Sequence, residues 1–268
     1  HNTEALADRK KMEYWMPVDW YNGGMEHVTR HMIYSRFWHH FLYDMGIVNT
    51  PEPYAKRSAQ GMILGSDGDK MSKSKGNVIY ADTLVDFFGV DAVRYFVLHE
   101  MPFENDGVIT WDLVIERFNS DLANILGNLV NRTVSMSNKY FGGVVTSTGV
   151  TGEVDADLKA VVTATRDRIV EKMAKLRVAD AISEVFALFR RCNKYIDETT
   201  PWVLAKDEAQ KDRLAEVLYN LTESITIGAS LLHPFLPETA EKIVAQLSTS
   251  LRDFDELNQF GLYPCLLY

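Results

Sequence analysis

The feature that most constrains the fold is a change in hydrophobic periodicity close to residue 110. Beyond it, apolar residues recur every three or four positions through successive segments, and most connections between the segments are short. The exception is the glycine- and threonine-rich stretch GGVVTSTGVTG at 142–152. The helical segments are 111–141, 154–175, 177–197, 209–232 and 237–247. This pattern predicts an α-helical bundle.

The chain before residue 110 instead alternates short apolar runs, glycine turns and helical periodicity. YWMPVDWY predicts a buried strand that runs into a turn at Asn22-Gly23-Gly24, and a helix should then extend to Gly46. SAQGMIL predicts a second strand, followed by a turn at 65–68 and a helix from about Asp82. This order is typical of α/β domains, in which ligands bind at the carboxyl ends of strands. We therefore predict two domains, 1–110 and 111–268.

Charge and cysteine content exclude few functions. A net charge of -9 argues against a generally basic nucleic-acid coat, so any such contact should come from local patches. Cys192 and Cys265 lie far apart, which excludes a thiolate zinc site and favours a reducing cytoplasm. No apolar run is long enough to predict a membrane span. A start at His1 and an abrupt end in GLYPCLLY predict a piece of a longer protein.

The stretch DKMSKSKGNV at 69–78 carries three lysines, Lys70, Lys73 and Lys75, on a loop of serines and glycine. Such ammonium groups can surround a triphosphate and stabilise charge that develops on pyrophosphate. A P-loop is excluded because the spacing G-x-x-x-x-G-K-[ST] is absent. The alternative interpretation is a solvated lysine-rich turn.

A second cluster, NGGMEHVTRH, places Gly24 and Glu26 where a predicted strand meets a helix. Glycine lets a nucleotide approach the backbone, and a carboxylate can accept hydrogen bonds from ribose hydroxyls. His27 and His31 are four apart, but HVTRH lacks the glutamate of H-E-x-x-H and a third ligand, so no metal site is predicted.

The helical part carries residues suited to reading RNA. Asn124, Asn128 and Arg132 are spaced i, i+4, i+8 and should share a helix face about 12 Å long. Such groups can read the base edges of an unstacked loop, and Trp202, which follows Pro201, can stack on a base. The alternatives are hydrogen bonding between helices for the asparagines and core packing for Trp202.

The string KMSKS resembles the signature loop of class I aminoacyl-tRNA synthetases. The resemblance implies that the loop closes over ATP, bound with Mg²⁺ as the substrate complex. Lys73 would stabilise the leaving pyrophosphate, with support from Lys70 and Ser72. Gly24 and Glu26 match the element of this family that binds the ribose of ATP. Residues 1–110 would then be an α/β remnant of a Rossmann-like catalytic domain, and residues 111–268 an all-α anticodon-binding domain.

Within this family, residues 1–78 resemble leucyl-tRNA synthetases, through YWMPVDWYNGGMEH and EPYAKRSAQGMIL. Residues 79–268 resemble methionyl-tRNA synthetases, through FNSDLANILGNLVNRTVSMSNKYF and KYIDETTPWVLAK. The second resemblance implies that Asn124, Asn128, Arg132 and Trp202 read the anticodon. His31 matches an amino-acid-pocket residue of both types. The switch at the lysine loop has two explanations, a divergent methionyl enzyme or two coding sequences joined there, and we expect the second.

The expected function is activation of methionine with ATP and its transfer to methionine tRNA. The alternatives are a leucine-type activity with leucine tRNA, a tRNA-binding module without catalysis, and a helical structural protein. The other nucleotide motif of the family, His-Ile-Gly-His, does not occur in the sequence, and WHHF at 38–41 lies inside a predicted helix. We therefore expect the chain alone to be inactive, cytoplasmic and independent of membranes, and we leave its oligomeric state open.

Overall fold

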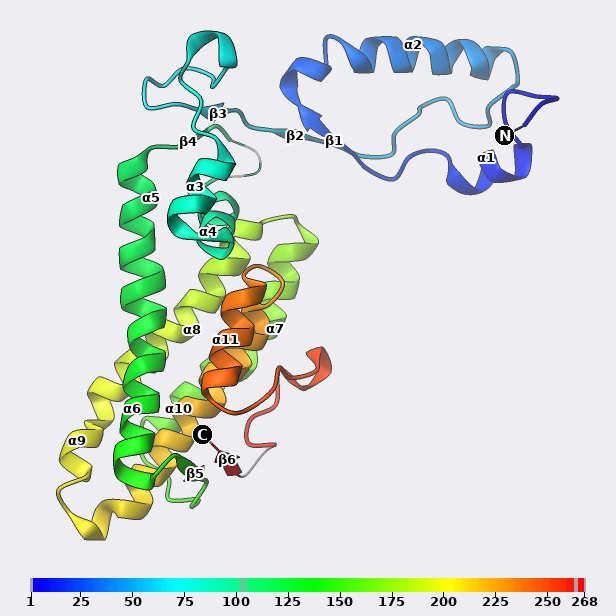
Figure 1. Ribbon diagram of the computed structural model, residues 1–268. Helices are drawn as coiled ribbons and strands as arrows, with labels where there is room; N and C mark the ends of the chain where they lie inside the picture. Colours follow the sequence, from blue (N-terminus) through cyan, green and yellow to red (C-terminus); the bar gives the residue numbers. More distant parts are fainter. Residues whose placement is uncertain (1, 102, 104, 263–264, 268) are drawn as a thin grey trace.

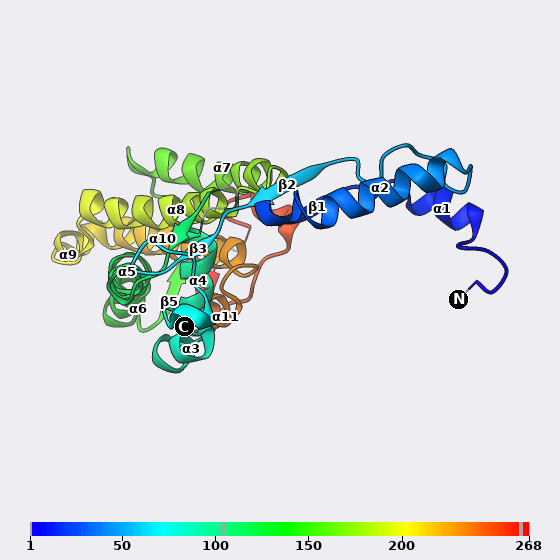
Figure 2. The same cartoon turned by 90° about the horizontal axis from the view of Figure 1, so that it is seen from above.

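The computed structural model describes residues 2–101, 103, 105–262 and 265–267. Figure 1 shows a helical body with a long extension formed by the first part of the chain, and Figure 2 shows the same separation from above. We call residues 2–60 the arm, residues 61–110 the loop module and residues 111–262 the bundle. No helix among the described residues is long and apolar enough to cross a membrane.

The arm contains two helices and a short parallel sheet. Its elements are α1 (Arg9–Trp15), β1 (Tyr21–Gly24), a 3₁₀ helix (Met25–His27), α2 (His31–Asp44) and β2 (Arg57–Gln60). Strands β1 and β2 pair in parallel, with Tyr21 opposite Arg57 and Gly24 opposite Gln60. The predicted helix ends as expected, because Gly46 takes a left-handed φ of 70° just beyond it.

Two predictions in the arm were wrong. Tyr14 and Trp15, expected in a buried strand, lie at the exposed end of α1, whose first turn is capped by the Asp8 carboxylate. The stretch Asn22-Gly23-Gly24, expected as a turn, forms most of strand β1. Pairing with β2 supplies the hydrogen bonds that a turn would otherwise satisfy internally, so tertiary contacts override local turn preference here.

The loop module holds the lysine loop between two strands and two helices. Its elements are β3 (Ile63–Leu64), a 3₁₀ helix (Lys73–Lys75), α3 (Ala81–Phe88), α4 (Val90–Glu100) and β4 (Gly107–Val108). The second predicted strand is split between β2 and β3, and β3 pairs in parallel with β4. Helix α3 begins within a residue of the predicted position.

The bundle confirms the predicted helical segments. It consists of α5 (Trp111–Arg117), a π-helix (Phe118–Gly127), α6 (Asn128–Phe141), α7 (Asp155–Ala174), α8 (Val178–Thr199), α9 (Pro201–Leu204), α10 (Lys211–Leu232) and α11 (Pro237–Gln246). A 3₁₀ helix, Glu208–Gln210, precedes α10, and another, Phe254–Glu256, follows α11. Strand β5 (Val144–Thr146) pairs antiparallel with β6 (Cys265–Leu267).

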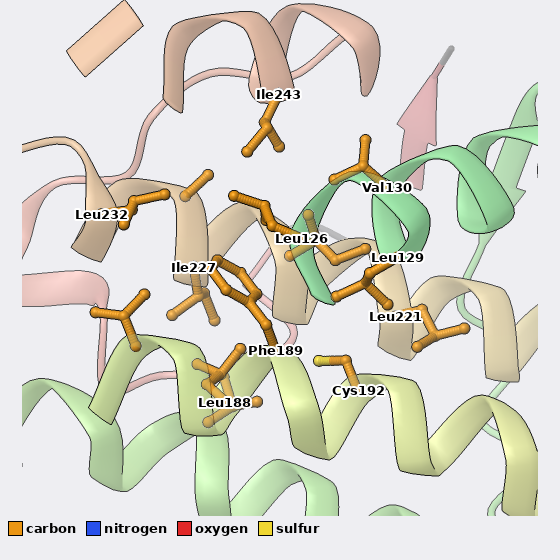
Figure 3. Close-up of a cluster of buried hydrophobic side chains, with 14 of the residues drawn as sticks. Leu126, Leu129, Val130, Leu188, Phe189, Cys192, Leu221, Ile227, Leu232 and Ile243 are labelled. Atoms are coloured by element: carbon orange, nitrogen blue, oxygen red, sulfur yellow. The ribbon is translucent and has the colours of Figure 1, made fainter. Parts of the chain in front are cut away.

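The bundle core forms where α10 packs against its neighbours. Figure 3 shows side chains from α6, α8, α10 and α11 converging on the ring of Phe189, which is fully buried. Residues 214–232 of α10 are all buried. An apolar area of this size is the main source of stability in a domain.

Helix α4 joins the loop module to the bundle. The Arg94 guanidinium donates to the carbonyl oxygens of Pro234 and Phe235 at 3.1 and 2.8 Å. The buried Tyr95 hydroxyl donates to Asp121 Oδ2 in the π-helix at 2.8 Å. Burial first, and then the Asp121 carboxylate, raise the pKa of Tyr95. Because α4 is tied to the bundle by these hydrogen bonds and by the buried Tyr95, the two parts form one packed unit.

Candidate functional site

The lysine loop is organised by acidic and amide side chains around it. Asp67 Oδ2 accepts from Asn77 Nδ2 at 3.1 Å, and Asn77 Oδ1 accepts from the Ser72 backbone N–H at 3.0 Å. Lys75 Nζ lies 2.6 Å from Asp69 Oδ2. The hydrogen bond from the backbone N–H of Asp69 lowers the pKa of Asp67 against the opposing effect of desolvation, with help from Asn77. The loop therefore has a defined shape in which Lys75 is already paired.

Lys70 and Lys73 differ from Lys75 in their surroundings. Lys70 Nζ lies 3.8 Å from Glu26 Oε1, which brings the lysine loop to the glycine–acid element of the arm. Lys73 is exposed at the start of the 3₁₀ helix and makes no ion pair among the described residues. An unpaired ammonium on a short loop is available to an incoming anion such as a phosphate.

Gly24 leaves space that the Glu26 carboxylate occupies. A Cβ added at Gly24 would lie 2.2 Å from Glu26 Oε2, so a side chain there would displace the carboxylate. The pKa of Glu26 is lowered mainly by a hydrogen bond from its own backbone N–H. Desolvation opposes this shift, and the charge of Lys70 adds to it. The carboxylate is thus held ionised in the 3₁₀ helix just after β1, where it can accept hydrogen bonds from hydroxyl groups.

His27 and His31 do not share the predicted helical face. His27 ends the 3₁₀ helix, whereas His31 begins α2. His31 Nδ1 forms a 2.7 Å hydrogen bond with the Tyr21 hydroxyl, and the two rings stack with centroids 5.5 Å apart. Within the described residues, no group of three His, Cys, Asp or Glu side chains could hold a metal ion.

The polar face predicted at 124–132 has two exposed asparagines and a half-buried Arg132, and it is not uniformly α-helical. Asn124 lies in the π-helix, whose i→i+5 bonding widens the turn, while Asn128 and Arg132 lie in α6. In the described part of the chain, neither asparagine side chain forms a hydrogen bond, so they do not tie helices together. That role belongs to Asn193, which donates to the Ile125 carbonyl at 2.9 Å.

The C-terminal end of α8 lies beside the polar face that carries Arg132. Arg132 Nη2 lies 3.4 Å from Asp197 Oδ1, so its guanidinium is directed toward α8. Trp202 follows five residues later on the short helix α9, with 42% of its surface exposed. Core packing of this indole is therefore not observed. An exposed indole and a guanidinium near one end of the bundle are groups that can stack on and bind unpaired bases.

Sequence reasoning missed the residues that hold these groups in place. Asp67 and Asn77 shape the lysine loop, Tyr21 binds His31, and Asp197 binds Arg132. The alternation of acids and lysines in GSDGDKMSKSK was a usable signal for internal pairing in the loop. No local signal marks Asp197, because it lies 65 residues from its partner.

Two protein-family models match the chain. The model described as "tRNA synthetases class I (M)" matches residues 7–134, and the "Anticodon binding domain of methionyl tRNA ligase" matches residues 145–261. The first match runs through the arm, the lysine loop and the start of the bundle without interruption. The chain is therefore a Rossmann-like class I catalytic fragment followed by a helical anticodon domain, as predicted.

Individual relatives give the same assignment. The chain is 45% identical over 257 residues to methionine–tRNA ligase of Caldanaerobacter subterraneus and 42% identical over 253 residues to that of Clostridium tetani. These matches cover 95% and 94% of this chain but 39% and 38% of the relatives. The chain thus spans well under half the length of these ligases.

A solved structure is also similar. Mycobacterium tuberculosis methionyl-tRNA synthetase in complex with methionyl-adenylate matches with a TM-score of 0.81 and 33% sequence identity. The match covers 95% of this chain and 49% of that structure.

These findings correct the expectation of a leucyl-type front joined to a methionyl-type back. The methionyl-type match begins at residue 7 and continues past the lysine loop, and the ligase matches extend over nearly the whole chain. The lysine loop is therefore not a boundary between two families. The chain belongs to the class I tRNA synthetases of the methionyl type.

Proposed function

We propose that this chain is the part of a cytoplasmic methionine–tRNA ligase that holds the phosphates and ribose of ATP and recognises methionine tRNA. The observation that carries the proposal is the approach of Lys70 to Glu26 at 3.8 Å, in a chain whose bundle matches a methionyl anticodon-binding domain. A phosphate-binding loop and a ribose acceptor are thereby adjacent. Activation of methionine requires both, because its adenylate forms as pyrophosphate leaves.

In the proposed reaction the methionine carboxylate attacks the α-phosphate of ATP, and the bond to pyrophosphate breaks. The free ammonium of Lys73 stabilises the charge on the departing pyrophosphate, while Lys70 and Ser72 support it from the same loop. Glu26 accepts hydrogen bonds from the ribose above Gly24, and His31 contributes to the amino-acid pocket. Mg²⁺ would enter with ATP, as part of the substrate.

The bundle recognises the tRNA in this proposal. Asn124 and Asn128 are exposed and offer free amide groups, and Arg132 offers a guanidinium, which suits base edges in an unstacked anticodon. Trp202 stacks on one of these bases. Since these side chains lie on the bundle, recognition can be tested without catalysis.

The test is filter binding of the 268-residue chain to methionine tRNA, leucine tRNA and methionine tRNA carrying a leucine anticodon. We expect preference for the first, and Trp202→Ala should weaken its binding about 5- to 100-fold, the loss of one stacked base. The matched control is Trp38→Ala, because Trp38 is also an exposed tryptophan but lies on the arm. Equal binding of all three RNAs, or an equal effect of both substitutions, would refute anticodon recognition by the bundle.

ATP–pyrophosphate exchange tests the catalytic side. The 268 residues contain no His-Ile-Gly-His sequence, so we expect no methionine-dependent exchange from this chain alone. Robust exchange would show that the described residues already form a complete site. Under that outcome, Lys73→Ala should abolish exchange and leave tRNA binding unchanged.

A further inference from the structure

The π-helix that carries Asn124 is held from outside by a side chain of α8. Asn193 Nδ2 donates to the backbone carbonyl of Ile125, the residue after Asn124, at 2.9 Å. The same atom donates at 3.2 Å to the carbonyl of Phe189 in its own helix, so each N–H group of the amide has an acceptor. Asn193 therefore ties the backbone of the π-helix to α8 beside a residue expected to read the anticodon.

The backbone at both Asn124 and Asn128 follows the wide turn of the π-helix. Asn124 lies within it, and the backbone N–H of Asn128 donates to the Ala123 carbonyl, five residues back rather than four. The π-helix ends at Gly127, where an added Cβ would lie 3.2 Å from the carbonyl oxygen of Leu122, also five residues back. The absence of a side chain at Gly127 thus leaves room for the widened turn.

The amides of Asn124 and Asn128 depend on this backbone for their direction. Both side chains are exposed, and neither forms a hydrogen bond to another described residue. The direction of such a side chain follows from its Cα–Cβ bond, which the local helix geometry fixes. A change from π to α bonding would turn Asn124 about the helix axis relative to Asn128. The hydrogen bond from Asn193 to Ile125 favours the π arrangement over that change.

The same side of α8 also contacts the other end of the polar face. Asp197 Oδ1, four residues beyond Asn193, lies 3.4 Å from Nη2 of Arg132 in α6. Residues spaced i, i+4 share one side of a helix, so α8 contacts the π-helix and α6 from a single side. Helix α8 can thus fix the two parts of the polar face relative to each other.

We propose that Asn193 is a positioning residue for anticodon recognition, which holds the π-helix in the register that sets the direction of the Asn124 amide relative to Asn128. The inference rests on the proposed function, because it assigns Asn193 a part in the base reading proposed for these two asparagines. Asn193 is half-buried and acts through the Ile125 carbonyl, without contact to the RNA. Its loss should therefore weaken discrimination between anticodons more than it weakens binding of tRNA in general.

The test is filter binding of the 268-residue chain to methionine tRNA and to the same tRNA carrying a leucine anticodon, expressed as the ratio of the two dissociation constants. Asn193→Ala should reduce this ratio about 2- to 10-fold, the equivalent of one hydrogen bond to a base. The matched control is Ser183→Ala, which removes a 3.3 Å hydrogen bond between α8 and His99, about 15 Å along the helix from Asn193. The control should leave the ratio unchanged, and an equal effect of both substitutions would overturn the proposal.

The unsubstituted chain separates this inference from the proposed function. If it binds both tRNAs equally, anticodon recognition by the bundle is refuted, and the role of Asn193 with it. If it prefers methionine tRNA and a folded Asn193→Ala protein keeps the full preference, only the role of Asn193 is refuted. Circular dichroism of each variant shows whether it is folded.

Two further variants show whether Asn193 acts through Asn124. Adding Asn193→Ala to Asn124→Ala should not reduce the ratio below that of Asn124→Ala alone, because the group that Asn193 positions is already gone. Gly127→Ala keeps Asn193 but crowds the Leu122 carbonyl, so it should lower the ratio as Asn193→Ala does, and it serves as the test if Asn193→Ala does not fold. An additional loss in the double variant, or an unchanged ratio in Gly127→Ala, would contradict the assignment.

Discussion

Helices α2 and α10 both have apolar residues at helical spacing, but they lie in very different surroundings. In α10 all of residues 214–232 are buried, because α6, α7, α8 and α11 surround it. In α2 the buried residues are His39 and Leu42, while Phe37 is 76% exposed. Figure 1 shows α2 along the outer edge of the arm, away from the bundle.

This contrast separates helix formation from stabilisation. Periodicity within the chain specifies where a helix forms, whereas the free energy gained depends on the apolar area removed from water. The same contrast predicts that the bundle contributes most of the stability of the described chain. We also expect the bundle to fold by itself and the arm to open first.

The largest difference in stability between the bundle and the arm should appear when one aromatic ring is deleted from each. Phe189→Ala should lower the free energy of unfolding by about 3–5 kcal/mol, because the ring is fully buried in the bundle core. Phe37→Ala on α2 should change it by about 0.5 kcal/mol or less. Urea unfolding followed by circular dichroism measures both. Similar losses from the two substitutions would mean that α2 is as well packed as the bundle.

Ion pairs offer a second comparison. Arg213 makes two contacts with the buried Asp155 carboxylate, at 2.6 and 2.7 Å, and Arg36 makes two with the half-exposed Glu52. Arg213→Ala should cost about 3 kcal/mol, since it leaves a buried charge that still has the Tyr195 hydroxyl as a donor.

Arg36→Ala should cost less than about 1 kcal/mol, because solvent screens exposed pairs. Chemical denaturation at low and high salt would test this difference. Only the Arg36 substitution should become weaker in effect as salt rises, and a strong salt dependence for Arg213 would contradict its buried position.

Adding a methyl group at a glycine should also distinguish the bundle from the arm, with a smaller change in stability than the substitutions above. A Cβ at Gly228 in α10 would lie 2.5 Å from Phe189 Cε1, whereas a Cβ at Gly23 in β1 would lie no closer than 3.7 Å to any neighbour. Gly228→Ala should therefore destabilise the protein by about 1–3 kcal/mol through overpacking.

Gly23→Ala should change stability by less than about 1 kcal/mol. Thermal unfolding of both variants, together with Gly228→Ala/Phe189→Leu, would resolve the cause. Partial rescue in the double variant supports a clash with the ring, and an additive loss argues against it.

The smallest effect concerns the pH response of the arm. The hydrogen bond from Arg36 is the largest cause that lowers the pKa of Glu52 from 4.5 to about 2. Desolvation opposes it, and the charge of Arg36 and then His40 lower the pKa further. Because the folded-state pKa is lowered, the stabilisation is complete above pH 4.5 and is lost as the pH falls toward 2. NMR titration of the Glu52 carboxyl carbon should show this value, and Arg36→Ala should return it toward 4.5. A midpoint near 4.5 in the unsubstituted protein would mean that the pair does not persist in solution.

The sequence predicted the bundle well because the relevant information is local. Each long helix from Trp111 to Gln246 was anticipated within a few residues, and Gly46 ended α2 as expected. The stretch Tyr14–Gly24 was misassigned because aromatic residues and glycines suit several backbone structures. Only the pairing of β1 with β2 selects among them.

The candidate site was predictable in its components but not in its contacts. The lysine loop, the Gly24–Glu26 element and the polar face near Asn128 were all visible as local patterns. The matching family models show that the arm was misassigned to the leucyl type, although the synthetase class was correct. Short shared motifs identify a class of enzyme more readily than an amino-acid specificity.

The sequence by itself determined the helical periodicity, the change of architecture near residue 110 and the chemical types gathered on the lysine loop. Tertiary structure alone decided that Lys70 approaches Glu26, that Arg132 binds Asp197 and that Asp91 accepts a hydrogen bond from the Thr239 backbone N–H. The physical reason is how far apart the interacting residues lie along the chain. Periodicity and turn preference depend on neighbours along the chain, whereas these contacts join residues 44, 65 and 148 positions apart. Such contacts form only when packing of the intervening elements brings the partners together.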